Sequence, residues 1–269
     1  MAHITDLVAP SPDVLRFFRA LANDTRLAIV RMLALSDLRA GEIGLALQLP
    51  SNAVAYHVKQ LQSLDLLHDR RSGADARDVY YHLDLPRLHH LFAATGDTLY
   101  PGMTAEPDSQ ARPSGAVSAA SRPLRVLFLC THNSARSQLA EAILRSMGGN
   151  QVEAFSAGSN PTEVDPDTIT VLREQGIDPT PHHAKPLALF AGQPFDYIIT
   201  VCDRVRDVCP VFPGDPSQVH WSFADPAVIA DPDRRLQAFR EVARELQTRI
   251  RYLLLLPHPA TGQRLRPLR

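Results

Sequence analysis

The sequence has few cysteines, no excess of charge of one sign and no long apolar run. Its 269 residues include three cysteines, an odd and sparse number that fits free or catalytic thiols better than a secreted disulfide framework. The formal net charge is −1, so contact with nucleic acid has to come from a local basic patch. The N-terminus lacks the basic and apolar regions of a signal peptide, and the apolar runs are too short to span a bilayer. These absences predict a cytoplasmic protein with no membrane segment.

The chain is long enough for two domains, and its composition changes between them. Residues 100–123 are poor in large apolar side chains and rich in Pro, Ser, Gly and Ala, which predicts a flexible linker. The predicted domains on either side are residues 1–99 and 124–256. Residues 257–269 are expected to form a disordered tail.

The N-terminal domain is predicted to be mainly helical, with a β-hairpin after the helices. Apolar residues recur at helical spacing in four segments, and Ser51 is placed as the N-cap of the fourth. Two strand patterns on either side of a turn at residues 73–76 predict the hairpin, and this order is typical of a winged helix-turn-helix fold. The predicted helices are residues 13–21, 24–35, 40–47 and 52–64, and the predicted strands are 66–71 and 79–83.

This domain resembles the ArsR family of homodimeric metalloid-responsive repressors over most of residues 10–95. The resemblance is carried by the stretches at residues 17–27, 50–61, 65–67 and 79–83. It implies a homodimer that binds operator DNA with an inverted repeat, with one helix in the major groove and the hairpin against phosphates. The candidates for groove contacts are Asn52, Tyr56, His57 and Lys59, and those for phosphate contacts are Arg70, Arg71 and Arg77.

The N-terminal domain departs from the arsenic-sensing members of that family in one respect. Those members carry cysteines at the start of the third helix, but residues 1–129 contain none. As(III) and thiophilic metals require soft thiolate ligands, so the usual inducer site is absent. The adjacent His89 and His90 could join a carboxylate in a metal site at a dimer interface, or could simply be exposed side chains.

The C-terminal domain is predicted to be α/β, with a central, mostly parallel sheet covered by helices. Strand patterns at residues 124–129, 152–156 and 197–201 alternate with helical patterns at 137–147, 165–175 and 233–255. Ligands of such sheets bind at the carboxyl ends of the strands, where Cys130 and Cys202 both lie. The two thiols are therefore expected to meet over one site.

Cys130 begins the loop that joins the first of these strands to a helix. A loop of this kind points successive backbone N–H groups inward at the positive end of the helix dipole, so a tetrahedral oxyanion fits there and the cysteine is held as thiolate. Arg136 adds a planar fork for two anion oxygens. The predicted oxyanion-binding residues are Thr131, His132, Asn133, Ser134, Ala135, Arg136 and Ser137.

The spacing Cys-x5-Arg followed by Ser is the signature of the low-molecular-weight tyrosine phosphatase fold, and residues 125–254 are similar to thioredoxin-coupled arsenate reductases of that superfamily. The similarity is carried by residues 130–141, 155–158 and 220–226, and by Cys202 with Cys209 and Pro210. It implies that Cys130 attacks arsenate while Asp225 protonates the departing oxygen. Cys202 would then attack Cys130, arsenite would leave, and Cys209 would resolve the disulfide for reduction by thioredoxin.

The resemblance requires no metal or other cofactor, with one open question. Asn133, Glu141 and Ser156 match residues that bind potassium near the loop in some relatives, but they could equally brace the loop by hydrogen bonds. Two loop residues differ from the pattern common in the superfamily. His132 stands where many members have Gly, and Ala135 replaces a second loop cysteine that could trap Cys130.

The combined pattern favours an arsenate reductase fused to an ArsR-type transcriptional regulator, with a role in arsenic resistance. A protein tyrosine phosphatase tethered to a regulator is the first alternative. Such phosphatases usually have aromatic residues beside the general acid, whereas Asp225 and Pro226 are followed by Ala227, Val228 and Ile229. The second alternative is a regulator whose C-terminal domain only senses oxyanions or redox state, without turnover.

Overall fold

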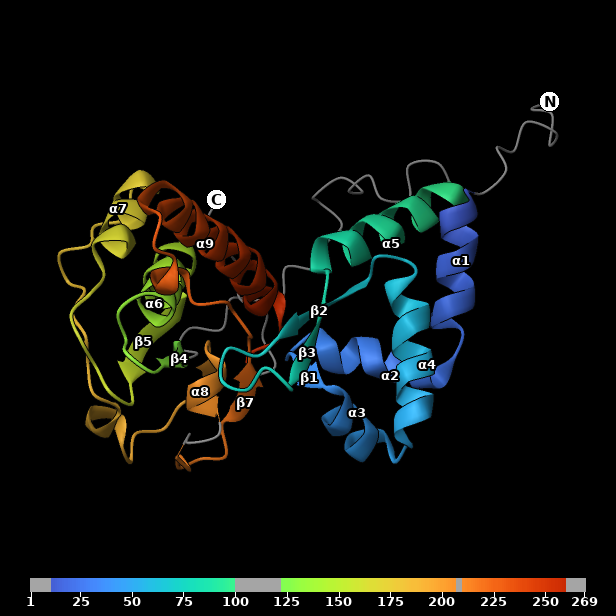
Figure 1. The fold of residues 1–269 in the computed structure, drawn as a ribbon, viewed down its shortest axis with the longest axis horizontal. Coiled ribbons are helices and arrows are strands. Elements are labelled where there is room, and N and C mark those ends of the chain that lie inside the picture. Colours follow the sequence, from blue (N-terminus) through green and yellow to red (C-terminus); the bar gives the residue numbers. More distant parts are fainter. Residues whose placement is uncertain (1–10, 100–121, 207–209, 260–269) are drawn as a thin grey trace. The chain divides into compact units, whose positions relative to one another are not determined.

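The computed structural model describes residues 11–99, 122–206 and 210–259 (Figure 1). The chain divides into two compact units. The first consists of Met1–Ala34, Leu38–Asp69 and Tyr81–Ala119, and the second of Leu35–Asp37, Arg70–Tyr80 and Ala120–Arg269. Cys209, nearly all of the predicted linker and most of the predicted tail lie outside the described residues.

Helices form most of the first unit, and two of them begin at residues whose side chains cap them. Ser11 accepts a hydrogen bond from the Val14 amide, and Asn23 accepts one from the Arg26 amide. α4 starts at Ser51 with Pro50 as its N-cap, so the prediction of Ser51 as the cap is wrong by one residue. The helices are α1 (Pro12–Leu21), α2 (Asp24–Leu33), α3 (Ala40–Leu47), α4 (Ser51–Gln62) and α5 (Leu85–Leu99).

The strands in this part of the sequence form a three-stranded sheet in the order β1-β3-β2, which includes the two predicted hairpin strands. Its strands are β1 (Leu38–Arg39), β2 (Leu67–Arg71) and β3 (Val79–Leu83). The sequence patterns did not predict β1 or α5. The apolar faces of the helices meet in a core that includes Phe17, Ile29, Ile43, Val54 and Leu91.

The second unit is built on a four-stranded parallel sheet in the order β5-β4-β6-β7. Its strands are β4 (Leu124–Cys130), β5 (Val152–Gly158), β6 (Tyr197–Thr200) and β7 (Ser217–His220). Every residue of β4 except Arg125 is buried, as expected for a central strand with both faces covered. The α/β prediction for this part is therefore confirmed, with β7 as an additional edge strand.

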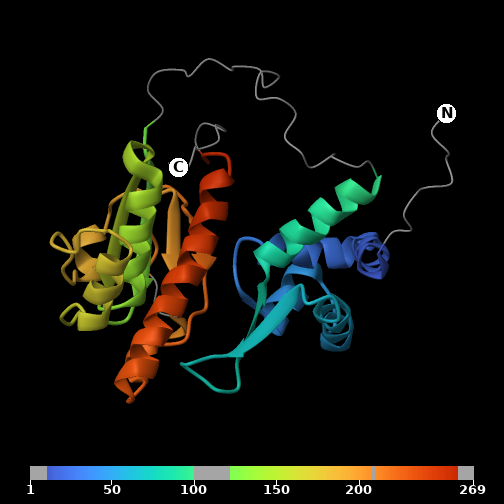
Figure 2. The ribbon, with the colours of Figure 1, turned by 90° about the horizontal axis from the view of Figure 1, so that it is seen from above.

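The same unit contains two long helices, α6 (Arg136–Gly148) and α9 (Pro232–Leu255). Figure 2 shows α6 in green and α9 in red. α7 (Pro166–Glu174) begins with Asp165 as its N-cap and Pro166 in its first turn, and α9 begins with Asp231 and Pro232 in the same way. Arg235 of α9 forms ion pairs with Asp165 and Asp167, which ties α9 to the start of α7. α8 (Asp203–Arg206) is a single turn that follows β6.

Among the described residues, the remaining helical segments are short 3₁₀ turns at Gly149–Gln151, Leu187–Phe190 and Pro226–Val228. In the part of the chain that the structure describes, no helix is both long and apolar enough to cross a membrane.

Candidate active site

Strand register brings the two described cysteines to one edge of the sheet. Cys130 is the last residue of β4 and pairs with Gly158, the last residue of β5. Leu129 pairs with Thr200 on β6, and the Val201 amide donates to the Leu129 carbonyl, so Cys202 follows at the same edge. As predicted, both thiols lie at the carboxyl ends of parallel strands.

The loop after Cys130 is held by its carbonyl groups. The carbonyls of Cys130, Thr131, His132 and Ser134 accept hydrogen bonds of 2.8 to 3.3 Å from amides in the segment at residues 159–165. In each peptide group the N–H points away from the carbonyl, so the loop amides face the opposite way, toward the interior of the loop. The Asn133 amide does so, and donates to Cys130 Sγ over 3.1 Å. Inward-facing amides at the N-terminus of a helix are an arrangement that suits an anion, so the oxyanion site stays a prediction for this loop.

Gly158 is the point at which β5 passes closest to this loop. A Cβ atom at this position would lie 2.7 Å from the Thr131 carbonyl oxygen and 3.0 Å from the Asn133 amide nitrogen. Both are backbone atoms that cannot move aside without distorting the loop. Glycine is therefore required here for close approach.

Asn133 organises the inside of the loop. It adopts a left-handed conformation with a φ of 50°, and its side chain is fully buried. Its Nδ2 donates to Ser137 Oγ (2.8 Å) and Ser156 Oγ (2.9 Å), and its Oδ1 accepts from Gln138 Nε2 (3.0 Å) and the Lys185 amide (2.8 Å). With every side-chain polar atom satisfied, Asn133 fixes the loop in one conformation.

Cys130 is buried, with 3% of its surface exposed, and its Sγ lies 2.8 Å from Ser137 Oγ. Burial raises the pKa of the Cys130 thiol, and the neighbouring Cys202 raises it further. Arg136 and the hydrogen bonds from Ser137 and Asn133 lower the pKa of Cys130, but the net direction is upward. The expectation that the loop holds Cys130 as a thiolate counted only the stabilising groups and left out this burial cost.

Arg136 begins α6 and joins the loop to the predicted general acid. Its Nη2 donates to Asp225 Oδ2 over 2.7 Å, and its Nη1 donates to the Phe223 carbonyl over 3.1 Å. Asp225 keeps 31% of its side chain exposed, whereas Arg136 is almost fully buried. The structure thus brings these two residues into contact, and their catalytic roles stay predictions.

Cys202 lies close to the same loop. Its Sγ is 3.4 Å from Thr131 Oγ1, and only 3% of its surface is exposed. Cys130 and Cys202 are both free thiols. Cys209, the third predicted redox cysteine, lies outside the described residues.

The residues considered for potassium do come together, but they already hold cations. Ser156 Oγ donates to Glu141 Oε2, while Lys185 Nζ lies 3.1 Å from the same oxygen and Arg145 Nη2 lies 2.6 Å from Oε1. Two positive side chains therefore neutralise Glu141, the one carboxylate of this set, and disfavour a further cation beside it. Among the described residues, no group of three or more His, Cys, Asp or Glu side chains could hold a metal.

Three of the four groove-contact candidates on α4 are accessible. Asn52, Tyr56 and Lys59 are exposed, whereas His57 is partly buried. Burial, together with the charge of Arg26, lowers the pKa of His57, which disfavours its cationic form. His89 and His90 are both exposed on α5.

The arginines of the predicted wing differ in their partners. Arg71 and Arg77 are exposed, and Arg77 forms a surface ion pair of 2.6 Å with Asp75. Arg70 instead places its Nη2 3.0 Å from both carboxylate oxygens of Asp203, within the second compact unit. In this conformation Arg70 is thus engaged with an internal anion.

The sequence patterns assigned no role to several polar residues of the site. Gln138 Nε2 donates to the carbonyls of Asn133 and His183, and Lys185 carries the cation beside Glu141. Asp203, which directly follows Cys202 in the chain, forms a buried pair with His220. For Gln138, the signal in the sequence was a polar residue on the buried face of a predicted helix. His220 lies in the stretch at residues 220–226 that carries the resemblance, although no role was predicted for it, and Asp203 and Lys185 have no local signal.

Comparisons with known proteins bear on this site. The sequence model of the low molecular weight phosphotyrosine protein phosphatase family matches residues 125–265. An arsenate reductase from Halalkalibacterium halodurans is 35% identical over 127 residues, which is 47% of this chain and 91% of that protein. One from Brevibacillus brevis is 36% identical over 126 residues, 47% of this chain and 90% of its own. A solved structure of an arsenate reductase in the oxidized state is 26% identical, covers 48% of this chain and 95% of its own, and has a TM-score of 0.42.

The first prediction concerns Gly158. Gly158→Ala should lower kcat/KM for the oxyanion substrate by about 10²-fold, because the new methyl group displaces the Thr131 and Asn133 backbone from the anion site. Gly41→Ala is the matched control, since nothing lies within 4 Å of a Cβ atom at Gly41. Steady-state kinetics and thermal melting of both variants test this. Wild-type kinetics in Gly158→Ala would contradict the role given to close approach.

The second prediction concerns the acidity of the nucleophile. Ser137→Ala should raise the pKa of Cys130 further, because it removes a hydrogen bond that lowers it. Below that pKa the thiolate fraction falls, so alkylation of Cys130 by iodoacetamide should slow at neutral pH, and its pH profile should move to higher pH. Ser159→Ala, an exposed serine beside the loop, is the control. An unchanged pH profile in Ser137→Ala would refute the assignment.

Proposed function

The chain belongs to the low molecular weight phosphotyrosine protein phosphatase family, and from this premise we propose an arsenate reductase fused to an ArsR-type transcriptional regulator. The reductase is the C-terminal part, because the arsenate reductases that it resembles are covered over about nine-tenths of their length. The regulator is the N-terminal part. A protein that senses arsenic and converts it would serve arsenic resistance in the cytoplasm.

The observation that carries the reductase activity is a second thiol beside the nucleophile. Cys202 lies against Thr131 of the anion loop, and its proximity contributes to the raised pKa of Cys130. Hydrolysis of a phosphate ester uses one nucleophile and water, so a buried second thiol has no role there. Reduction of an oxyanion needs two electrons, and two thiols that become a disulfide supply them.

The first step uses the loop, Arg136 and Asp225. Arsenate binds to the loop amides and the Arg136 guanidinium, and the Cys130 thiolate attacks arsenic to form a sulfur–arsenic bond. One oxygen leaves as water after Asp225 donates a proton. Arg136 contacts Asp225 directly, which places the acid beside the anion that Arg136 would bind.

The second step transfers the electrons. The Cys202 thiolate attacks Cys130 Sγ, the sulfur–arsenic bond breaks, and its electron pair stays on arsenic, which leaves as arsenite. Cys209 then attacks Cys202 and releases Cys130 as a thiolate. The resulting disulfide between Cys202 and Cys209 is reduced by an external dithiol protein, for which thioredoxin is the proposed partner.

A phosphotyrosine phosphatase is the second candidate, and the residues beside the acid disfavour it. Asp225 is followed by the short turn Pro226–Val228, where Val228 is 78% exposed and aliphatic. No aromatic side chain stands at these positions to pack against a phenyl ring. Residual hydrolysis of small phosphate esters is compatible with the same loop.

The N-terminal part is proposed to bind operator DNA as a homodimer. Exposed Asn52, Tyr56 and Lys59 on α4 support groove contacts. Large apolar side chains remain exposed on α1 and α5, with Leu15 at 41%, Phe18 at 44% and Phe92 at 54%. Exposed apolar side chains of this size are typical of a surface that a second copy covers. A sensor without turnover is the remaining alternative, and it predicts no arsenite production.

The third prediction tests the relay. Cys130→Ser should abolish arsenate reduction, because an alcohol is a poor nucleophile near neutral pH and forms no disulfide. Cys202→Ser should stop with arsenic on Cys130, and Cys209→Ser should accumulate the disulfide between Cys130 and Cys202. Mass spectrometry of acid-quenched protein identifies these species. Full thioredoxin-driven turnover by Cys209→Ser would rule out the relay, and phosphatase turnover without arsenate reduction would favour the second candidate.

The fourth prediction concerns the inducer. Operator binding by the full chain should weaken as salt rises, because phosphate contacts release counterions. Residues 1–129 contain no cysteine, so any release of DNA by arsenite should require Cys130, Cys202 and Cys209. The chain with all three changed to Ser should bind the operator like wild type and ignore arsenite in gel-shift titrations. Release of that variant by arsenite would show an inducer site without thiols.

A further inference from the structure

Cys202 is held in place by its neighbours more than by its own side chain. Within the described residues, the polar partner of its Sγ is Thr131 Oγ1 at 3.4 Å, a weak contact for a thiol. On its N-terminal side, the Val201 amide donates to the Leu129 carbonyl over 2.8 Å, which continues the pairing of β6 with β4. On its C-terminal side stands Asp203, the first residue of α8.

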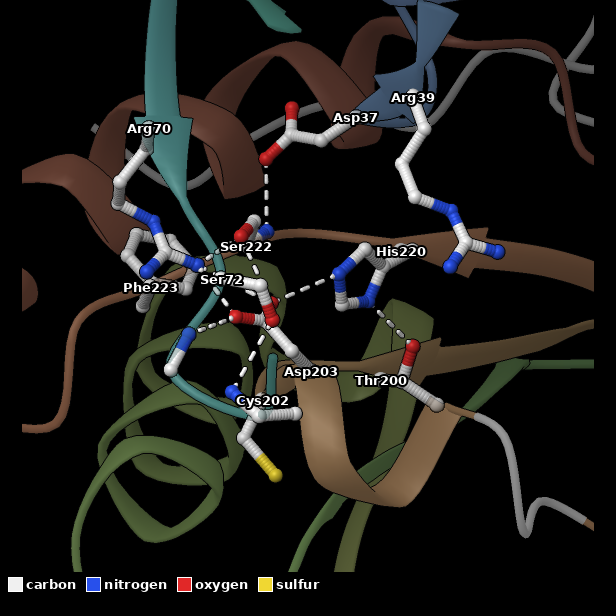
Figure 3. Close-up of polar contacts among 12 residues, drawn as sticks. Asp37, Arg39, Arg70, Ser72, Thr200, Cys202, Asp203, His220, Ser222 and Phe223 are labelled. Carbon is white, nitrogen blue, oxygen red and sulfur yellow. Dashed lines mark hydrogen bonds and ion pairs between the residues drawn. The ribbon is translucent and has the colours of Figure 1, made fainter. Parts of the chain in front are cut away.

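Asp203 is a buried carboxylate with an unusually complete set of hydrogen-bond donors (Figure 3). Ser222 Oγ donates to its Oδ1 over 2.7 Å, and His220 Nε2 lies 3.1 Å from the same oxygen. Gly73 and Arg70, which belong to the same compact unit, add an amide at 2.9 Å and a guanidinium at 3.0 Å. Only 5% of Asp203 is exposed.

The donors of Asp203 are themselves fixed. His220 is the last residue of β7 and pairs with Thr200 in the sheet, and its Nδ1 lies 2.8 Å from Thr200 Oγ1. Burial alone would raise the pKa of Asp203, but His220, Ser222, Arg70 and the Gly73 amide hold it well below its usual range. Asp203 is therefore an ionised carboxylate that links the end of β6, which it follows in the chain, to the end of β7 through His220.

We propose that Asp203, held by His220 and Ser222, is the positioning residue that keeps Cys202 within reach of Cys130 in the electron-transfer step. This inference rests on the reductase function proposed above. Asp203 contacts neither thiol in the described structure, so it acts through the backbone of Cys202. If Asp203 were released, the chain after Val201 would lose its nearest fixed point, and Cys202 Sγ would sample positions away from Cys130.

The chain offers a matched control at the other end of the same strand. Asp196 precedes β6 as Asp203 follows it, and only 6% of Asp196 is exposed. It pairs with Arg122 at 2.6 Å and accepts the Arg125 amide at 2.9 Å. Asp196→Asn therefore removes a buried, ion-paired carboxylate from the same strand but at the edge far from the thiols.

The test uses the full chain with Cys209→Ser, in which the disulfide between Cys130 and Cys202 is expected to accumulate. Asp203→Asn and Asp196→Asn are each added to this background, and the rate of disulfide formation after arsenate addition is followed by quenching and mass spectrometry. Asp203→Asn should slow this step by about 10²-fold, the scale expected when a reacting group is displaced by about an ångström. Inhibition by phosphate, which reports the anion loop, should stay within about twofold of the parent, and Asp196→Asn should leave both readouts unchanged.

Several outcomes would overturn the positioning role. One is disulfide formation at the parent rate in Asp203→Asn, and another is an equal loss in Asp196→Asn, which would indicate general destabilisation. Loss of phosphate binding together with the disulfide would show that Asp203 supports the loop instead. His220→Gln and Ser222→Ala, each removing one donor, should slow the step by smaller factors, and thermal melting verifies that all variants fold.

A further arm separates this inference from the proposed function. If the parent forms no disulfide with arsenate, the reductase function fails. Diamide, which oxidises a pair of thiols to a disulfide and is itself reduced to the hydrazine, then tests positioning alone. Slower closure between Cys130 and Cys202 by diamide in Asp203→Asn than in Asp196→Asn would support the positioning role, and equal rates would refute it.

Discussion

The parallel register of β4 with its two neighbours is the constraint on which the rest of the site depends. It sets Cys130 opposite Gly158 on one side and brings the end of β6 level with it on the other. A register shift of one residue would turn every side chain of β4 to the opposite face. The nucleophile, the glycine that admits the loop and the second thiol would then no longer share one edge. Sheet pairing thus determines where the loop after Cys130 begins and what lies beside it.

Burial is the second constraint, and it acts differently on thiols and carboxylates. The thiol of Cys130 has few donors, so burial raises its pKa despite Arg136 and the loop hydrogen bonds. The carboxylate of Asp203 is buried to a similar extent, yet its donors more than offset the same cost. The site therefore places a buried negative charge directly after Cys202 in the chain, while the pKa of the Cys130 thiol is raised. Glu141 is another buried carboxylate, and it is paired with Lys185 and Arg145.

Long elements with a clear period could be predicted from the sequence, as could β6, a short strand that is buried throughout, whereas β7 and β1 could not. The buried run of β4 and the helical pattern of α9 identify those elements to within one or two residues. β7 has four residues and β1 two, too few for a period to be visible. α5 contains Pro86 and Gly96, which look like helix breakers in a sequence. Pro86, however, stands in the first turn, where proline is tolerated.

The same distinction holds within the site. Cys130 to Ser137 form one contiguous motif, so their shared location can be predicted from spacing alone. Asp203, His220 and Lys185 are ordinary residue types that lie outside this motif in the sequence. The strand order β4-β6-β7 brings Asp203 and His220 to the site, and the hydrogen bond from the Lys185 amide to Asn133 brings Lys185 to it. The engagement of Arg70 with Asp203 is of this kind too, because a wing arginine has no sequence feature that distinguishes an internal partner from a DNA phosphate.

A single loop can support hydrolysis or reduction, because the covalent adduct on Cys130 has two possible fates. Water attacking the bound oxyanion releases it unchanged in oxidation state, whereas a thiol attacking Cys130 Sγ leaves an electron pair on arsenic. The competition is decided by which nucleophile is closer and better aligned. Cys202 is buried beside Thr131, where water is largely excluded and an intramolecular attack carries a high effective concentration. A displacement of Cys202 by about an ångström would forfeit much of that advantage. If Asp203 positions Cys202 as proposed, the choice between the two chemistries depends on how firmly the end of β6 is held as well as on the loop after Cys130.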